Sequence, residues 1–405
     1  MKYITVRARK SRVSRRLTIL LCSLCVAGVL LVPAQAADVV IKSSVSQKIS
    51  VNDNYDLVSS SPGAVLVSRT SLSASILAEM PTFVIGTGLS LSYLAYAGPG
   101  RGTRENGFDF PSLNFNATKT LKNTTFTVSG SFSIDDTATT QIDDTGIIDI
   151  NANQITSNLN AGVSRNINNN NSISVDISAT SVSFSEGADQ FTPYIDVNVS
   201  GQWTHLVNSN IQTGLTSSIG FYQADGASEL RRRIFKAGGT ASVQLTKTFS
   251  VNGGLGVDVV SAEGSGAMPA SFDILAVGYS GNFSANYRGN RTEYALNMSH
   301  GVEPSASGRL EQRTRLSLTA THDIPINARS DLTLAASYAY LRSASPTISE
   351  TASQIVRFSP TYSIELTPYW DANLGYTFTY RDEDGEKAHS NLIYFSIARS
   401  GTLLP

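Results

Sequence analysis

Hydroxyl and amide side chains recur at every second position along much of this chain, and a small number of charged side chains share those positions. Such groups exchange hydrogen bonds with water and with hydroxylated solutes, and charges of both signs create no strong field of a single sign. The residue types therefore predict contact with polar solutes. The clearest candidates are Arg69, Asp176, Asp196, Asn198, Gln202, Asp258, Arg313, Arg315 and Arg357.

Catalytic chemistry is disfavoured by the placing of the histidines. All four lie at the ends of expected strands or at apolar positions of the alternating pattern, away from any Ser and Asp that share the polar positions; they are His205, His300, His322 and His389. The sequence contains no nucleophile elbow, no HExxH and no phosphate-binding glycine loop followed by a helix. We therefore predict no catalytic residue, no metal ligand and no cofactor.

The stretch from Tyr194 to Tyr222 shows which element positions the polar side chains. Apolar residues such as Val197 and Val199 alternate with polar residues such as Asn198, then a turn follows and the alternation resumes. A period of two predicts β-strands with one apolar and one polar face, and two such strands around a short turn predict an antiparallel hairpin. Each arm has about ten residues, the length of a tilted strand that crosses a bilayer.

The same rhythm recurs from Val45 to Ile397 and predicts about 18 strands, with 16 to 18 as the expected range. Short turns alternate strictly with long loops, as in outer-membrane barrels with short periplasmic turns and long extracellular loops. We therefore predict an all-β fold, a closed antiparallel transmembrane barrel in the outer membrane. Aromatic residues near strand ends predict two interfacial girdles: Phe184, Tyr194, Tyr222, Tyr340 and Tyr380 at the loop side, and Trp203, Phe249, Tyr287 and Trp370 at the turn side.

Composition agrees with a barrel. Charged residues are 16% of the chain, below the roughly 25% of soluble domains, and the mean hydropathy of −0.05 rules out a helical membrane protein. The net charge of −1 gives no indication of a nucleic-acid partner. A soluble β-sandwich or solenoid is the structural alternative, but the residue identities do not repeat and the polar positions hold few Lys and Glu.

The first 36 residues form a separate segment. Seven basic residues precede an apolar run from Leu17 to Val32, and Ala34-Gln35-Ala36 supplies the small residues that a signal peptidase reads. We predict a signal peptide at 1–36 and one barrel domain at 37–405. The only two cysteines, Cys22 and Cys25, lie within this segment.

Two arginine groups have alternative interpretations. Arg313 and Arg315 are two residues apart, so both side chains should point into the barrel, either as a constriction or as part of a salt-bridge network in the wall. Arg231-Arg232-Arg233 lies beside a long loop and either contacts anionic lipopolysaccharide or is a solvated loop base. The expected partners are accordingly outer-membrane lipid and lipopolysaccharide.

At Ile49-Ser-Val-Asn-Asp-Asn-Tyr55, followed by a Ser/Pro/Gly loop and a hairpin, the chain resembles the outer-membrane β-barrel porins that accompany exopolysaccharide export and synthesis clusters in Gram-negative bacteria. The resemblance implies passive export of an exopolysaccharide, with periplasmic export or synthesis proteins as partners. A general diffusion porin for small hydrophilic solutes is an alternative. Another is a plugged, surface-binding barrel that uses the acidic loop from Asp135 to Asp144. The last aromatic residue, Phe395, precedes the C-terminus by ten residues, which differs from barrels with a terminal aromatic assembly signal.

Overall fold

The computed structural model describes residues 38–102, 104, 106–136, 153–184, 191–224, 229–265, 276–304, 310–345 and 348–404. The predicted signal peptide and most of the acidic loop lie outside these residues. The described chain forms one short 3₁₀ helix, η1 (Pro99–Arg101), and 18 strands: β1 (Asp38–Asn52), β2 (Val65–Met80), β3 (Phe83–Ala97), β4 (Gly107–Leu121), β5 (Thr124–Asp136), β6 (Asn153–Asn168), β7 (Asn171–Phe184), β8 (Tyr194–Asn208), β9 (Ile211–Ala224), β10 (Glu229–Thr246), β11 (Phe249–Ser265), β12 (Ala276–Arg288), β13 (Thr292–Pro304), β14 (Leu310–Asn327), β15 (Ser330–Ser345), β16 (Ile348–Thr367), β17 (Trp370–Glu383) and β18 (Glu386–Leu404).

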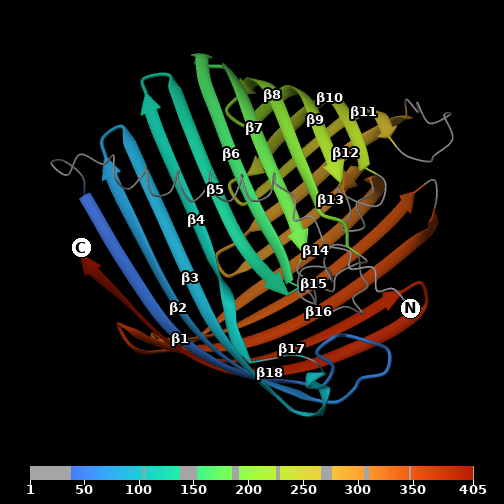
Figure 1. Cartoon of the computed structure of the whole chain (residues 1–405). Coiled ribbons are helices and arrows are strands. Elements are labelled where there is room, and N and C mark those ends of the chain that lie inside the picture. Colours follow the sequence, from blue (N-terminus) through green and yellow to red (C-terminus); the bar gives the residue numbers. More distant parts are fainter. Residues whose placement is uncertain are drawn as a thin grey trace, which may run out of the picture.

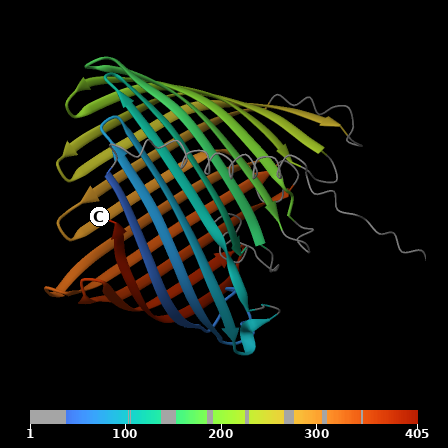
Figure 2. The same ribbon diagram turned by 60° about the vertical axis from the view of Figure 1, so that its left-hand side comes forward.

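The strands close into a single barrel (Figure 1, Figure 2). Each strand pairs with its sequence neighbours in antiparallel register, and β1 also pairs with β18 from Ile41–Leu404 to Asn52–Leu392. This closure removes the free sheet edges and satisfies the backbone within the sheet. The predicted all-β, antiparallel 18-stranded barrel is confirmed. No helix among the described residues has the length and apolar character needed to cross a membrane.

Large apolar side chains cover the outer face of the wall. Leu255 is 79% exposed, and Val257 on the same strand, Phe235 on β10 and Leu215 on β9 are also exposed. The polar residues between them point to the opposite, inner face, because successive side chains of a strand alternate. A soluble protein rarely exposes a large continuous apolar surface, whereas a bilayer covers one without cost. The outer face is therefore built for lipid.

Asparagine side chains fix several of the short turns. The Asn168 carboxamide oxygen accepts from the backbone N–H groups of Asn170 and Asn171 at 2.9 and 2.8 Å. The Asn208 carboxamide accepts in the same way at 2.8 and 2.9 Å. Such Asx turns hold the chain in a tight reversal with few residues, which matches the short turns predicted on this side.

The predicted strict alternation of short turns and long loops is wrong near the C-terminus. Two residues, Asp384 and Gly385, connect β17 to β18 on the side opposite the Asn-capped turns. Their φ angles of 50° and 89° are those of a tight hairpin turn, in which glycine is favoured. The residues that were expected to form a long loop instead extend the strands, and β16 has 20 residues and β18 has 19.

Three of the aromatic residues assigned to the loop-side girdle face inward. Tyr222 is 2% exposed and packs in a cluster with Ala224, Ile234 and Val260, against which Tyr194 also lies. Phe184 has inward parity: it occupies an even position of β7, whereas the odd positions, such as Val175 and Ile177, are exposed on the outer face. The sequence prediction used only the nearness of these residues to a loop. The direction of a side chain depends instead on whether its position in the strand is odd or even, because successive side chains point to opposite faces. Tyr340 and Tyr380 have outward parity, as do the four turn-side residues.

A hydrogen-bonded latch joins the end of β1 to the last strand. The Asp53 carboxylate accepts from the backbone and side-chain N–H groups of Asn391 at 2.7 and 2.6 Å. The buried Asn54 carboxamide donates to the carbonyl of His389 at 2.9 Å, and the Ser390 hydroxyl donates to Asn52 at 2.7 Å. The segment that carries the family resemblance thus fastens the seam at which the barrel closes.

Replacing Asp53 by alanine should lower the free energy of unfolding by about 2 kcal/mol, because two charge-assisted hydrogen bonds across the seam are lost. The temperature at which unheated protein loses its compact band on a denaturing gel measures this. Ser61→Ala is the matched control, since its hydroxyl bonds to the Asp53 carbonyl outside the seam. Equal melting of both variants would contradict a role at the seam.

Candidate functional site

The inner face of the barrel carries ladders of polar side chains that bond across neighbouring strands. Serine hydroxyls pair at 2.7 Å between Ser44 and Ser73 and at 2.8 Å between Ser71 and Ser92. On β5 to β7, Asn158 donates to Ser131 at 3.3 Å and accepts from Thr180 at 2.8 Å. These short side chains keep one another in place and leave further lone pairs and hydrogens for water or solute.

One ion pair is set into this wall between β10 and β11. Asp258 is 0% exposed, accepts a hydrogen bond from the Ser280 hydroxyl at 2.6 Å and lies 3.5 Å from the ammonium group of Lys236. Lys236 also donates to the carbonyl of Val302 at 3.3 Å and remains partly exposed. A buried carboxylate is tolerated where a cation and a hydroxyl compensate its charge. This ion pair is therefore part of the packed structure of the wall.

Arg313 and Arg315 share the inner face of β14, yet they differ in exposure. Arg313 is 1% exposed, whereas Arg315 is partly exposed and pairs with Glu303 of β13 at 3.0 Å. Of the two interpretations in the sequence, this geometry favours a charge network within the wall for Arg313. Arg315 retains access to the lumen.

Four of the sequence candidates lie together on β7 and β8. Asp176 is opposite Ser200, Asp196 is opposite Thr180, and Asn198 and Gln202 follow on the same face as Asp196. Gly162 on β6 makes room for this group, since a Cβ there would lie 2.3 Å from the Asp176 carboxylate oxygen. This side of the wall is therefore acidic and amide-rich.

Basic side chains gather on the other side. Arg357 on β16 and Arg69 on β2 both have inward parity, and Arg69 lies directly opposite Lys48 of β1. Arg381 on β17 is opposite Ile355 and pairs with Glu383 at 3.5 Å. Strands β7 and β16 are nine positions apart in a ring of 18, so Arg357 lies on the opposite side of the barrel from Asp176. Opposed charges of this kind create a field across the lumen that orients a solute with separated charges.

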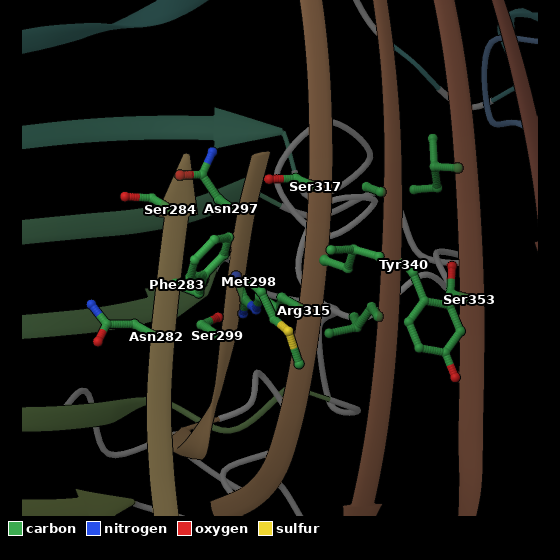
Figure 3. Close-up of a pocket in the computed structure, with 14 residues that line it drawn as sticks. Asn282, Phe283, Ser284, Asn297, Met298, Ser299, Arg315, Ser317, Tyr340 and Ser353 are labelled. Atoms are coloured by element: carbon green, nitrogen blue, oxygen red, sulfur yellow. The ribbon is translucent and has the colours of Figure 1, made fainter. Parts of the chain in front are cut away.

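A hollow of about 530 Å³ lies along β12 to β16 (Figure 3). Arg315, Asn297 and Asn282 line one part, and Leu341 and Ile355 line another. A second hollow of about 290 Å³ lies between Asn198 and Asn282, over the backbone of Gly238, Gly254 and Gly256. Because these glycines have no side chains, the inner surface is recessed there. Both hollows combine hydrogen-bonding groups with apolar surface, as solute sites commonly do.

Several charged residues of this wall were missed by the sequence reasoning, namely Lys48, Lys236, Glu303, Arg381 and Glu383. The signal was present for Lys236, which alternates with the outward Phe235 and Ala237. Parity alone would have placed it with Asp258. The described residues contain no group of three His, Cys, Asp or Glu side chains arranged to hold a metal ion.

The apolar outer face, the closed strand ladder and the polar inner face occur together in one kind of protein. The chain is an outer-membrane β-barrel. It shares this fold with Pseudomonas aeruginosa OpdQ, at 7% identity and a TM-score of 0.50 over 90% of this chain and 99% of that one. Acinetobacter baumannii OccAB4 matches at 10% identity and a TM-score of 0.49, over 92% of this chain and 100% of that one. Pseudomonas aeruginosa OccK2 (OpdF) matches at 11% identity and a TM-score of 0.49, over 91% of this chain and 99% of that one.

No protein-family model and no curated protein matches the chain. Identities this low establish the fold but do not indicate which solute, if any, passes through the barrel.

Proposed function

We propose that the barrel is a passive outer-membrane channel for small hydrophilic solutes. The observation that carries the proposal is the largely polar inner face, in which hydroxyls and amides are interspersed with a few charges of both signs. Such a lining replaces part of the hydration shell of a solute but does not bind the solute tightly. Both properties are needed for passage, because the solute must enter the lumen and also leave it. About 18 strands also enclose a lumen wide enough for water-filled passage.

The charges favour solutes that carry polar or separated charged groups. Asp176 and Asp196 on one side and Arg315 and Arg357 on the other are too few to exclude ions of either sign. They are sufficient to orient a solute as it passes, because fields are stronger in a confined lumen than in bulk water. The candidate inner-face residues act here as a wall rather than as a single binding site.

Export of an exopolysaccharide has weaker support than passage of small solutes. The resemblance to export-associated porins rests on the segment from Ile49 to Tyr55, and three residues of that segment bond to β18. Their residue types are therefore explained by closure of the barrel. Nothing in that geometry calls for a polysaccharide or for a periplasmic export partner.

Swelling of liposomes that contain the purified protein tests the proposal. We expect rapid swelling with monosaccharides, slower swelling with tri- and tetrasaccharides, and none with a long dextran, because passage falls with solute size. Liposomes with heat-denatured protein are the control. Absence of swelling with every solute would support a plugged barrel, and passage of dextran at the monosaccharide rate would support polysaccharide export.

A further inference from the structure

A row of polar residues crosses the largely apolar outer wall on β13 to β15. His300, Thr314 and Arg342 lie directly opposite one another on successive strands, and Gln312 lies beside them. All four have the parity of the exposed outer residues Met298 and Leu318. We call these four residues the outer-wall polar row.

Hydrogen bonds within the row direct the Thr314 hydroxyl outward. The Gln312 amide nitrogen lies 2.8 Å from His300 Nε2, so this ring nitrogen must accept. The other ring nitrogen, Nδ1, then carries the proton and donates to Thr314 Oγ1 at 2.7 Å. Since the hydroxyl oxygen already accepts, its own hydrogen is left to donate to a further group, next to the exposed Arg342 on the neighbouring strand.

Tyr279 adds a flat exposed surface beside the row. Its ring stacks on His300 with a centroid distance of 4.6 Å and an interplanar angle of 18°. It is 68% exposed, although it lies on a wall that a bilayer covers. A tyrosine with an apolar ring and a polar tip suits the boundary between acyl chains and headgroups.

The strand register sets the height of the row. Trp203 near the periplasmic turn is joined to Arg342 by successive directly opposite residues, from β8 to β15. These seven steps of about 4.8 Å, with strands tilted by about 40°, raise Arg342 about 22 Å above Trp203. The apolar band of such barrels is about 25 Å tall. The row therefore rises from His300 toward the outer boundary of the bilayer, and its Arg342 end lies close to that boundary.

We propose that the outer-wall polar row binds the phosphorylated headgroup of an outer-leaflet glycolipid, lipopolysaccharide. Arg342 supplies the charge that a phosphate requires, and the oriented Thr314 hydroxyl supplies a second donor. His300 and Gln312 position that hydroxyl, and Tyr279 offers a face to a sugar ring. The acyl chains lie against the apolar residues below, such as Met298 and Tyr340.

Titration of the detergent-solubilised protein with fluorescent lipopolysaccharide tests this site. Arg342→Gln should weaken binding about tenfold and Thr314→Val by a smaller factor, because each removes a donor to phosphate. Arg399→Gln is the matched control, since Arg399 is an outward arginine over Trp370 near the periplasmic boundary. It should bind as the parent protein does. Each variant is first shown to keep the heat-dependent gel shift of the folded barrel.

Two further arms identify the source of the phosphate. Removal of the lipid phosphates should weaken binding by the parent protein to the level of Arg342→Gln, and millimolar inorganic phosphate should fail to displace the intact lipid. Equal binding by Arg342→Gln and the parent protein would overturn the proposal. So would undiminished binding of the dephosphorylated lipid, or full displacement by inorganic phosphate.

Discussion

Replacing Lys236 by methionine should lower the free energy of unfolding by about 2 to 3 kcal/mol, one of the largest effects expected for a single change in this wall. The variant removes the ammonium group that lies 3.5 Å from the Asp258 carboxylate, although Asp258 is completely buried. The Ser280 hydroxyl alone does not compensate a full charge. Urea unfolding of the protein in lipid vesicles, followed by tryptophan fluorescence, measures the loss.

The double variant Lys236→Met with Asp258→Asn should recover most of that stability, because the buried charge is removed together with its partner. Arg288→Met is the control for loss of a surface ion pair. Arg288 and Glu293 are 2.7 Å apart but well exposed, so that change should have an effect of about 0.5 kcal/mol or less. An unfolding curve for Lys236→Met that coincides with that of Arg288→Met would show that the pair contributes little to the wall.

The fold was predictable because a period of two is a strong constraint. In the hairpin from Tyr194 to Tyr222, most apolar residues, such as Leu215 and Phe221, face out and polar residues such as Asn198 and Gln202 face in, and a shift of one residue would reverse every side chain. The strand count and the closed architecture follow from repetition of that pattern. The inward parity of candidates such as Asp176 and Asp258 follows from the same rule.

Features that depend on contacts between distant parts of the chain could not be predicted in the same way. The bonds of Asp53 and Asn54 to Asn391 and His389 join segments more than 330 residues apart, and no local pattern announces them. The inward cluster around Tyr222 was misplaced because aromatic residues near loops suit either face. The tight turn at Gly385 was not predicted, because the residues on either side of it were assigned to a long loop, whereas in the structure they extend strands β17 and β18.

Cysteine accessibility is the other change with a large expected effect. The only native cysteines, Cys22 and Cys25, precede the described residues, so a barrel with both changed to serine accepts single cysteines as reporters. Asn198→Cys places a thiol on the inner face of β8, and Val199→Cys places one on the outer face of the adjacent position. A charged, membrane-impermeant thiol reagent reaches only the thiol that faces water.

The most direct test of a polar, water-filled lumen is the ionic current through these two variants in planar bilayers before and after the reagent is added. We expect the current through Asn198→Cys to fall in clear steps, because bulk and charge are added inside the lumen, and the current through Val199→Cys to stay unchanged. A barrel that passes no current, or a block of Val199→Cys with Asn198→Cys unaffected, would contradict the account.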